Sequence, residues 1–131
     1  MDNTESALKN IGMFKVLNSV EFQALVGAAH RIEMPADAII ATEGEEGKEC
    51  YLILNGAVQI FTTTTNGGEM ALAKVSKGRI IGEQALLPGG TGRRNASMRA
   101  FSDVSLLTIP KDQFLKVLAR NRPLEQRLLH R

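Results

Sequence analysis

The sequence predicts an α+β domain that is mainly β: an antiparallel β-roll or jelly roll with an N-terminal helical segment, one short internal helix and two C-terminal helices. Short β-rich segments separated by glycine turns fill residues 35–110, whereas apolar residues recur at helical spacing on either side. The 44% hydrophobic and 23% charged residues are typical of a globular protein. We expect one domain over residues 1–131, with a helical lead-in (1–34), the β-roll (35–110) and C-terminal helices (111–131).

The lead-in carries a helix start signal. Asn18 can cap a helix, and Glu21, three residues later, can bond back to the amide of Asn18. Apolar residues follow at helical spacing, and Pro35 is the first residue that would stop the helix. We therefore expect helix from Ser19 to the region before Pro35.

The central part predicts six strands. Asn66-Gly67-Gly68 indicates a hairpin, because a tight turn of this kind requires positive φ. The threonines before it are β-branched and are expected to extend a strand. The predicted strands are Ala38–Thr42, Tyr51–Leu54, Ala57–Thr65, Met70–Val75, Ser97–Ala100 and Ser105–Ile109.

The C-terminal part is predicted to be helical again. Phe114 and Leu118 belong to an apolar stripe that follows Pro110. Pro123 disfavours helical geometry in Arg122 but starts a new helix well, so a second helix is expected from Leu124.

Composition excludes several classes of function. The single Cys50 leaves no disulfide framework, and it is expected to be a packing residue in a reducing compartment. No apolar run is long enough to cross a membrane and the N-terminus does not resemble a signal peptide, so we expect a cytoplasmic protein without membrane contact. His30 and His130 have no acid or nucleophile spaced beside them, so we expect neither an enzyme nor a metal site.

Charge is uneven along the chain. Residues 1–91 carry seven Lys and Arg against eleven Asp and Glu, whereas residues 92–131 carry nine against three. This excess of positive charge is compatible with an anion site in the last third, or with solvated helix faces.

The most informative stretch runs from Gly78 to Ser97. A glycine leads into a short helix that begins with Glu83, and an arginine pair follows a glycine-rich loop. An arginine can donate two parallel hydrogen bonds to a phosphate, and a carboxylate can accept a hydrogen bond from a ribose hydroxyl. This pairing suggests a nucleotide with a free 2′-OH.

The stretch resembles the phosphate-binding cassette of the cyclic-nucleotide-binding domain family. Gly-Glu-x-Ala-Leu, a loop and Arg-x-Ala-Ser fall on residues 82–97, which we call the cassette. A second segment, residues 44–56, is similar to the turn-strand-glycine block of the same family. Two motifs in order make the resemblance specific.

The resemblance implies a role for each matching residue. Arg94 would pair with the cyclic phosphate and Glu83 would accept a hydrogen bond from the ribose 2′-OH. Gly82 would allow close backbone approach, Ser97 could bond the phosphate or the base, and Asn95 occupies a position that helps to select the base. The expected ligand-binding residues, including those that offer backbone amides, are Gly82, Glu83, Gln84, Ala85, Leu86, Arg94, Asn95, Ala96 and Ser97.

Two departures from the family pattern leave alternatives open. The Pro88–Gly92 loop is about two residues longer than is common, so Arg93 could replace Arg94 as the phosphate ligand, although Ala96-Ser97 favours Arg94. The chain also ends where relatives continue a helix that covers the base, and we expect Leu128 or Leu129 to cover it here. Neither arginine is assigned to the core, so both are expected to be dispensable for folding.

The sequence therefore predicts a receptor for cyclic AMP, or for cyclic GMP, with cyclic AMP favoured by family frequency alone. No cofactor is expected, and the partners would be the nucleotide and an effector protein or second chain, reached through movement of the C-terminal helices. The alternative is a β-roll interaction module in which Glu83 and Arg94 form a structural ion pair. DNA binding is not expected, because the short basic tail cannot supply a supported recognition helix.

Overall fold

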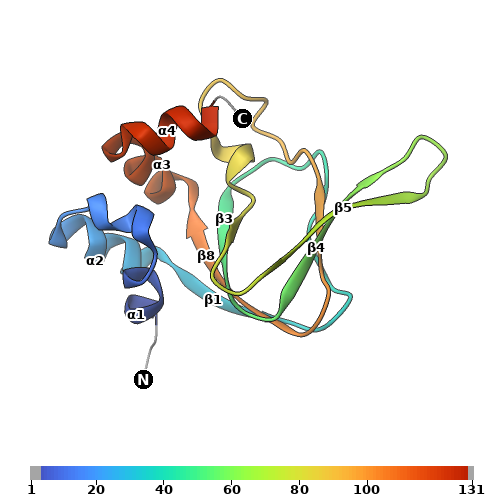
Figure 1. The fold of residues 1–131 in the computed structure, drawn as a ribbon, viewed down its shortest axis with the longest axis horizontal. Helices are drawn as coiled ribbons and strands as arrows, with labels where there is room; N and C mark the ends of the chain where they lie inside the picture. Colours follow the sequence, from blue (N-terminus) through green and yellow to red (C-terminus); the bar gives the residue numbers. More distant parts are fainter. Residues whose placement is uncertain (1–3, 130–131) are drawn as a thin grey trace.

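The computed structural model describes residues 4–129, with the side chains of residues 124 and 127–129 outside that description. Two four-stranded antiparallel sheets form a roll, and the N-terminal and C-terminal helices gather at one end of it (Figure 1). The predicted fold class, a mainly β α+β roll with flanking helices, is confirmed.

Helix α2 (Ser19–Ala28) of the N-terminal region begins directly after its capping residue, Asn18. The predicted cap is confirmed: the side chain of Asn18 accepts a hydrogen bond from the Glu21 amide at 2.8 Å, and Glu21 accepts one from the Asn18 amide at 3.0 Å. Glu21 also pairs with Arg120 at 2.6 Å, which ties the N-terminal helices to the C-terminal ones. The elements are α1 (Thr4–Lys9), a 3₁₀ helix η1 (Gly12–Val16) and α2 (Ser19–Ala28).

The prediction of a helix extending to Pro35 is wrong for its last part. Helix α2 ends at Ala28, and β1 (His30–Met34) follows it as a strand. Ile32 and Met34 point toward the core while Arg31 and Glu33 are exposed, which is the period of a strand and not of a helix. Pairing of β1 with β8 along its whole length decides the conformation.

The strands pair in two sheets. One has the order β1-β8-β3-β6 and the other β2-β7-β4-β5, and all pairs are antiparallel. All six predicted strands are present, with ends that differ by a few residues, and β1 and β6 were not predicted. The remaining bounds are β2 (Ile39–Ala41), β3 (Glu49–Asn55), β4 (Ala57–Thr63), β5 (Glu69–Ser76), β6 (Ile80–Ile81), β7 (Ser97–Ala100) and β8 (Val104–Pro110).

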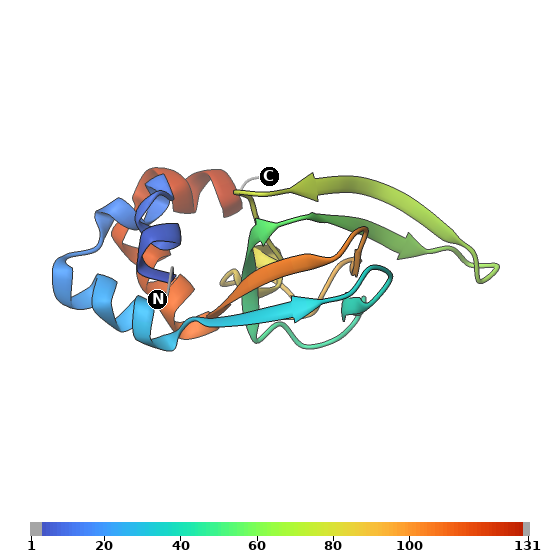
Figure 2. The ribbon, with the colours of Figure 1, turned by 90° about the horizontal axis from the view of Figure 1, so that it is seen from below.

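The β4–β5 hairpin is the part of the roll that projects farthest from the helices (Figures 1 and 2). The predicted turn is confirmed, with the Thr64 amide donating to the carbonyl of Gly68 at 2.8 Å. Strand β4 ends at Thr63, two residues before the predicted end, because Thr64 belongs to the turn.

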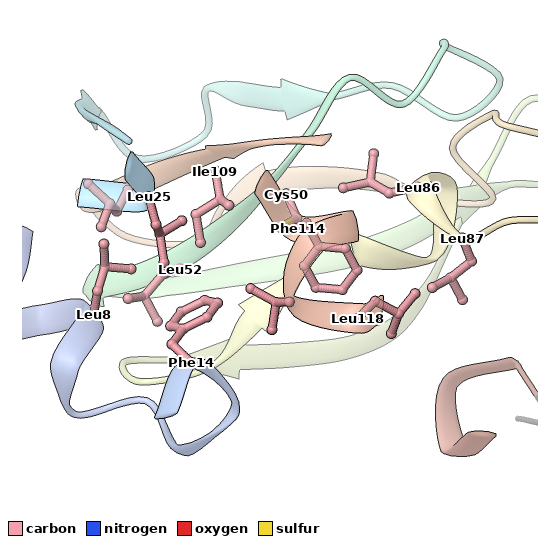
Figure 3. Packing of buried hydrophobic residues seen from close by; sticks show 12 residues of the cluster. Leu8, Phe14, Leu25, Cys50, Leu52, Leu86, Leu87, Ile109, Phe114 and Leu118 are labelled. Atoms are coloured by element: carbon pink, nitrogen blue, oxygen red, sulfur yellow. The ribbon is translucent and has the colours of Figure 1, made fainter. Parts of the chain in front are cut away.

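The hydrophobic core has two clusters. The first lies between the helices and the sheet that contains β3 and β8, with Phe14, Phe114 and Leu118 at its centre (Figure 3). Cys50 is fully buried in it, and burial raises the pKa of its thiol, so the predicted packing role is confirmed. The second cluster fills the roll and includes Tyr51 and Met98, which reach the cassette.

Two helices complete the fold. Helix α3 (Lys111–Arg120) follows Pro110 as predicted, and α4 (Arg122–Leu129) begins two residues before the predicted start. Proline is tolerated in the first turn of a helix, since its missing N–H would have no partner there. No helix within residues 4–129 is long and apolar enough to span a membrane.

Candidate functional site

A cavity of about 230 Å³ lies beside the cassette. It is bounded by β4, β5, β6 and β7 and by a 3₁₀ helix, η2 (Glu83–Leu86), which follows β6 directly. The lining residues are Ile60, Val75, Arg79, Ile80, Ile81, Gly82, Glu83, Gln84, Ala85, Arg94, Asn95, Ala96 and Met98. Two segments separated by the glycine-rich loop thus meet at one site.

Seven of the nine predicted ligand residues line this cavity, and two lie elsewhere. Leu86 is buried in the first core cluster, where it anchors η2. Ser97 is buried in β7, and its hydroxyl accepts a hydrogen bond from the amide of Glu43 at 2.9 Å. Ser97 therefore holds the neighbouring turn in place, and no ligand role is needed to explain its burial.

Arg94 is the buried cation of the site, with 6% of its surface exposed. Its Nη1 donates to the Gly82 carbonyl at 2.9 Å and its Nη2 to the Glu49 carbonyl at 2.7 Å. The guanidinium carbon lies 5.5 Å from the centre of the Tyr51 ring, a distance at which the ring attracts a cation. Only two of its five N–H groups are used in these bonds.

This burial corrects the expectation that Arg94 lies outside the core. Two carbonyls depend on its guanidinium, so the side chain contributes to the local fold. In the part of the chain that the structure describes, no carboxylate lies within ion-pair distance of Arg94. Among the described residues, Arg94 therefore has no ion pair with Glu83 at this distance, and a buried guanidinium with N–H groups to spare is suited to an anion in the cavity.

Tyr51 forms the floor beneath this arginine. Burial, followed by the nearby Glu49 carboxylate, raises the pKa of Tyr51 to about 12, so its hydroxyl stays protonated. That hydroxyl donates to Glu49 at 3.4 Å.

Among the described residues, no group of three His, Cys, Asp or Glu side chains is placed to bind a metal.

Gly82 is required by two features of the site. Its φ of 81° is left-handed, a conformation that costs other residues about 1–2 kcal/mol. A Cβ at this position would lie 2.7 Å from Nη1 of Arg94. The close approach inferred from the sequence is thus an approach to the arginine.

The second motif, in residues 44–56, is hydrogen-bonded to the cassette through its backbone. The Gly44 amide donates to the Arg94 carbonyl at 2.8 Å, and the Arg94 amide donates to the Glu45 carbonyl at 2.7 Å. Arg93 is exposed as predicted, and its Nη1 donates to the Gly44 carbonyl at 3.1 Å. The backbone therefore turns Arg94 inward and Arg93 outward.

Sequence reasoning missed the walls of the cavity. Ile60, Val75 and Met98 come from three neighbouring strands, and Arg79 lies next to β6. Side chains that alternate along a strand share a face, but which face meets the cassette depends on pairing between distant segments. In the sequence, Ile60, Val75 and Met98 could be recognised only as apolar residues of predicted strands, and not as residues that line a cavity.

The fold and site together define a β-roll binding domain with a buried arginine in its cavity. The model of the cyclic nucleotide-binding domain family matches residues 31–121, and the chain belongs to this family.

Named relatives agree with this assignment. The cyclic AMP receptor protein of Thermus thermophilus is 30% identical over 113 residues, which cover 86% of this chain and 51% of that protein. The cAMP-bound PfPKA-R structure has a TM-score of 0.76 and 26% identity, and it covers 93% of this chain and 44% of that chain. The EAL enzyme Bd1971, with structures in cAMP-bound and cGMP-bound forms, is 33% identical over 76% of this chain and 28% of that chain, with TM-scores of 0.65 and 0.66. This chain spans about half or less of the length of each of these three relatives.

Proposed function

We propose that this domain is a receptor for a purine 3′,5′-cyclic monophosphate, cyclic AMP or cyclic GMP, with a binding and regulatory role. The observation that carries the proposal is the buried guanidinium of Arg94, which lines the cavity and has no carboxylate counter-ion among the described residues. A singly charged cyclic phosphate would supply that counter-ion, and the N–H groups that remain on the guanidinium can donate to its oxygens.

The other cassette residues fit the same ligand. Glu83 lines the cavity next to Gly82, where a carboxylate can accept a hydrogen bond from the ribose 2′-OH. Ala85 and Ala96 also line it, and their small side chains leave room for a phosphate near the backbone amides. The apolar walls formed by Ile60 and Val75 suit the faces of a base.

Titration calorimetry with cyclic AMP and cyclic GMP tests the proposal directly. We expect one site per chain and weaker binding of 5′-AMP. The 2′-deoxy analogue should bind about 10- to 150-fold more weakly than its parent, because a hydrogen bond to a charged group contributes about 1.5–3 kcal/mol. In Glu83→Ala the parent and its 2′-deoxy analogue should bind equally. Equal binding of both to the unaltered protein would remove the role assigned to Glu83.

We also propose that α4 contributes to the cover over the base and that ligand binding moves the C-terminal helices. Helix α4 contacts α3, and α3 packs against η2 of the cassette, which supports a mechanical connection. The side chains of Leu128 and Leu129 lie outside the description, so their contact with the base stays a prediction.

Truncation after Pro123 should release ligand several-fold faster in stopped-flow measurements, because it removes most of α4. The 131-residue chain measured under the same conditions is the reference for this off-rate. An off-rate in the Pro123 truncation equal to that of the parent would mean that α4 does not cover the base.

One observation favours the alternative function, an interaction module without nucleotide binding. Arg94 already donates to two carbonyls, so the fold itself makes use of the cation. The same calorimetric titration separates the two functions, since absence of heat with both nucleotides would support the module.

A further inference from the structure

One side-chain donor at the cavity has no acceptor. Nε2 of Gln84 is shielded from solvent and has no hydrogen-bond partner within the described part of the chain. The residue as a whole is half-buried and lines the cavity. A buried donor without an acceptor is uncommon, because the group loses its water and gains no partner, which destabilises the folded state.

The family motif does not account for a glutamine at this position. The motif reads Gly-Glu-x-Ala-Leu, and Gln84 occupies the variable position, whose side chain is given no role by the resemblance. A methionine or leucine of similar length could pack there without an unsatisfied donor. The amide is therefore a feature of this chain that the cassette pattern leaves unexplained.

The 3₁₀ helix η2 fixes the place of Gln84 along the cavity. Ala85 and Leu86, which follow it in the helix, are buried, and a Cβ on Gly47 would overlap the side chain of Ala85, so the loop before β3 packs directly on η2. The Leu87 amide also donates to the Gln84 carbonyl at 3.3 Å. Gln84 is thus held between the carboxylate proposed for the ribose and the alanine proposed for the phosphate.

The side-chain amide must turn before a ligand can meet it, because Nε2 is shielded in this structure. Turning breaks no hydrogen bond of Nε2, and the torsions of a glutamine side chain let the amide move while the helix stays in place. An acceptor bound in the cavity would then satisfy the donor.

The cyclic phosphate offers the acceptors that suit this place best. In a 3′,5′-cyclic monophosphate the 3′ ester oxygen is on the carbon next to the 2′-OH, so the hydroxyl and the phosphate are neighbours. The two exocyclic oxygens share the negative charge, and hydrogen bonds to a charged acceptor are roughly twice as strong as neutral ones. Since the 2′-OH is assigned to Glu83, an exocyclic oxygen is the acceptor that remains for Gln84.

We propose that the side-chain amide of Gln84 turns into the cavity when the ligand binds and donates to an exocyclic oxygen of the cyclic phosphate, as a second side-chain donor beside Arg94. This inference rests on the proposed function, because it names a further contact to the same ligand. Without ligand, the same amide is an unsatisfied group that lowers stability. Gln84 therefore favours the bound state both by making this bond and by losing its unsatisfied donor.

Gln84→Met separates the two effects, because methionine has a similar length but no donor. The ligand-free variant should unfold at a temperature a few degrees above that of the parent, since the unsatisfied amide is gone. Its affinity for cyclic AMP or cyclic GMP should fall about tenfold or more, since a hydrogen bond to a charged oxygen is lost. Gln59→Met is the matched control for affinity and should not change it, because Gln59 is a half-buried glutamine of β4 that does not line the cavity.

Phosphorothioate analogues of the nucleotide locate the acceptor. Each of the two diastereomers carries sulfur in place of one exocyclic oxygen, and sulfur is the weaker acceptor. For one diastereomer, the ratio of its dissociation constant to that of the parent nucleotide should fall several-fold in Gln84→Met, and for the other diastereomer it should stay the same. The ratio for the 2′-deoxy analogue should also stay the same, because the 2′-OH is assigned to Glu83.

Gln84→Glu tests the polarity of the contact. A carboxylate has nearly the shape of the amide but would repel the phosphate, so this variant should bind more weakly than Gln84→Met. If Gln84→Glu bound more tightly than Gln84→Met, the side chain would be facing a hydroxyl donor, and the assignment to the phosphate would be wrong.

The outcomes distinguish this inference from the proposed function. Parent-like affinity in Gln84→Met, with thermal unfolding showing that the variant is folded, overturns the inference alone, and so do unchanged ratios for both diastereomers. A lower unfolding temperature of ligand-free Gln84→Met would mean that the amide is already satisfied in the free protein, which also overturns the inference. If neither nucleotide binds the unaltered protein, the proposed function fails and the inference fails with it.

Discussion

Replacement of Arg94 with alanine is expected to weaken cyclic-nucleotide binding by about 30-fold to several thousandfold. The change would leave a desolvated phosphate without its cation, a loss of about 2–5 kcal/mol. Arg94→Lys should recover only part of the affinity, because lysine keeps the charge but loses the planar fork. Calorimetric dissociation constants for the three proteins measure the effect.

The same change should also lower stability. Without the guanidinium, the carbonyls of Gly82 and Glu49 lose their donors, and a buried unsatisfied group costs about 1–3 kcal/mol. Denaturant unfolding measures this part separately, and affinity should be compared where each variant is folded. Arg93→Ala is the control and should change neither quantity much, since Arg93 is exposed.

Two results would contradict the assignment of Arg94. If Arg93→Ala abolished binding while Arg94→Ala kept it, the phosphate ligand would be Arg93. If both variants bound like the parent, the phosphate would bind elsewhere.

The second large effect is expected for Gly82→Ala. The left-handed φ of 81° adds strain of about 1–2 kcal/mol, and the new Cβ would lie 2.7 Å from Nη1 of Arg94. We therefore expect lower stability together with a loss of affinity of about tenfold or more, because the displaced guanidinium no longer meets the phosphate in the right geometry.

Gly67→Ala separates strain from displacement. Gly67 has a φ of 86°, but a Cβ there would meet no atom within 4 Å, and the residue lies in the β4–β5 hairpin turn. This variant should lose stability and keep its affinity. If Gly82→Ala kept its affinity as well, Gly82 would not be positioning Arg94.

Local signals made much of the fold predictable. The Asn18 and Glu21 cap and the Asn66-Gly67-Gly68 turn depend on residues close in sequence, and the structure contains both. Strand β1 was missed because its alternation is only five residues long and follows a helix without a proline or glycine between them. Pairing with β8, some seventy residues away, is what stabilises it.

In the cassette, too, some features could be predicted from the order of residues and others depend on contacts between distant segments. Its order of residues identified the family and named seven residues that line the cavity. The opposite orientations of Arg93 and Arg94 follow from backbone bonds between residues 44–45 and 94, which no local pattern specifies.

The sequence by itself determined the fold class, the helix cap, the hairpin and the residues of the cassette, since these depend on local conformational preference and on motif spacing. The tertiary structure decided that β1 is a strand, that Arg94 is buried against the Gly82 and Glu49 carbonyls, and that Arg79 and Gln84 line the cavity. The physical reason is that burial and hydrogen-bond partners arise from contacts between segments distant in sequence, and chain order alone does not contain their geometry.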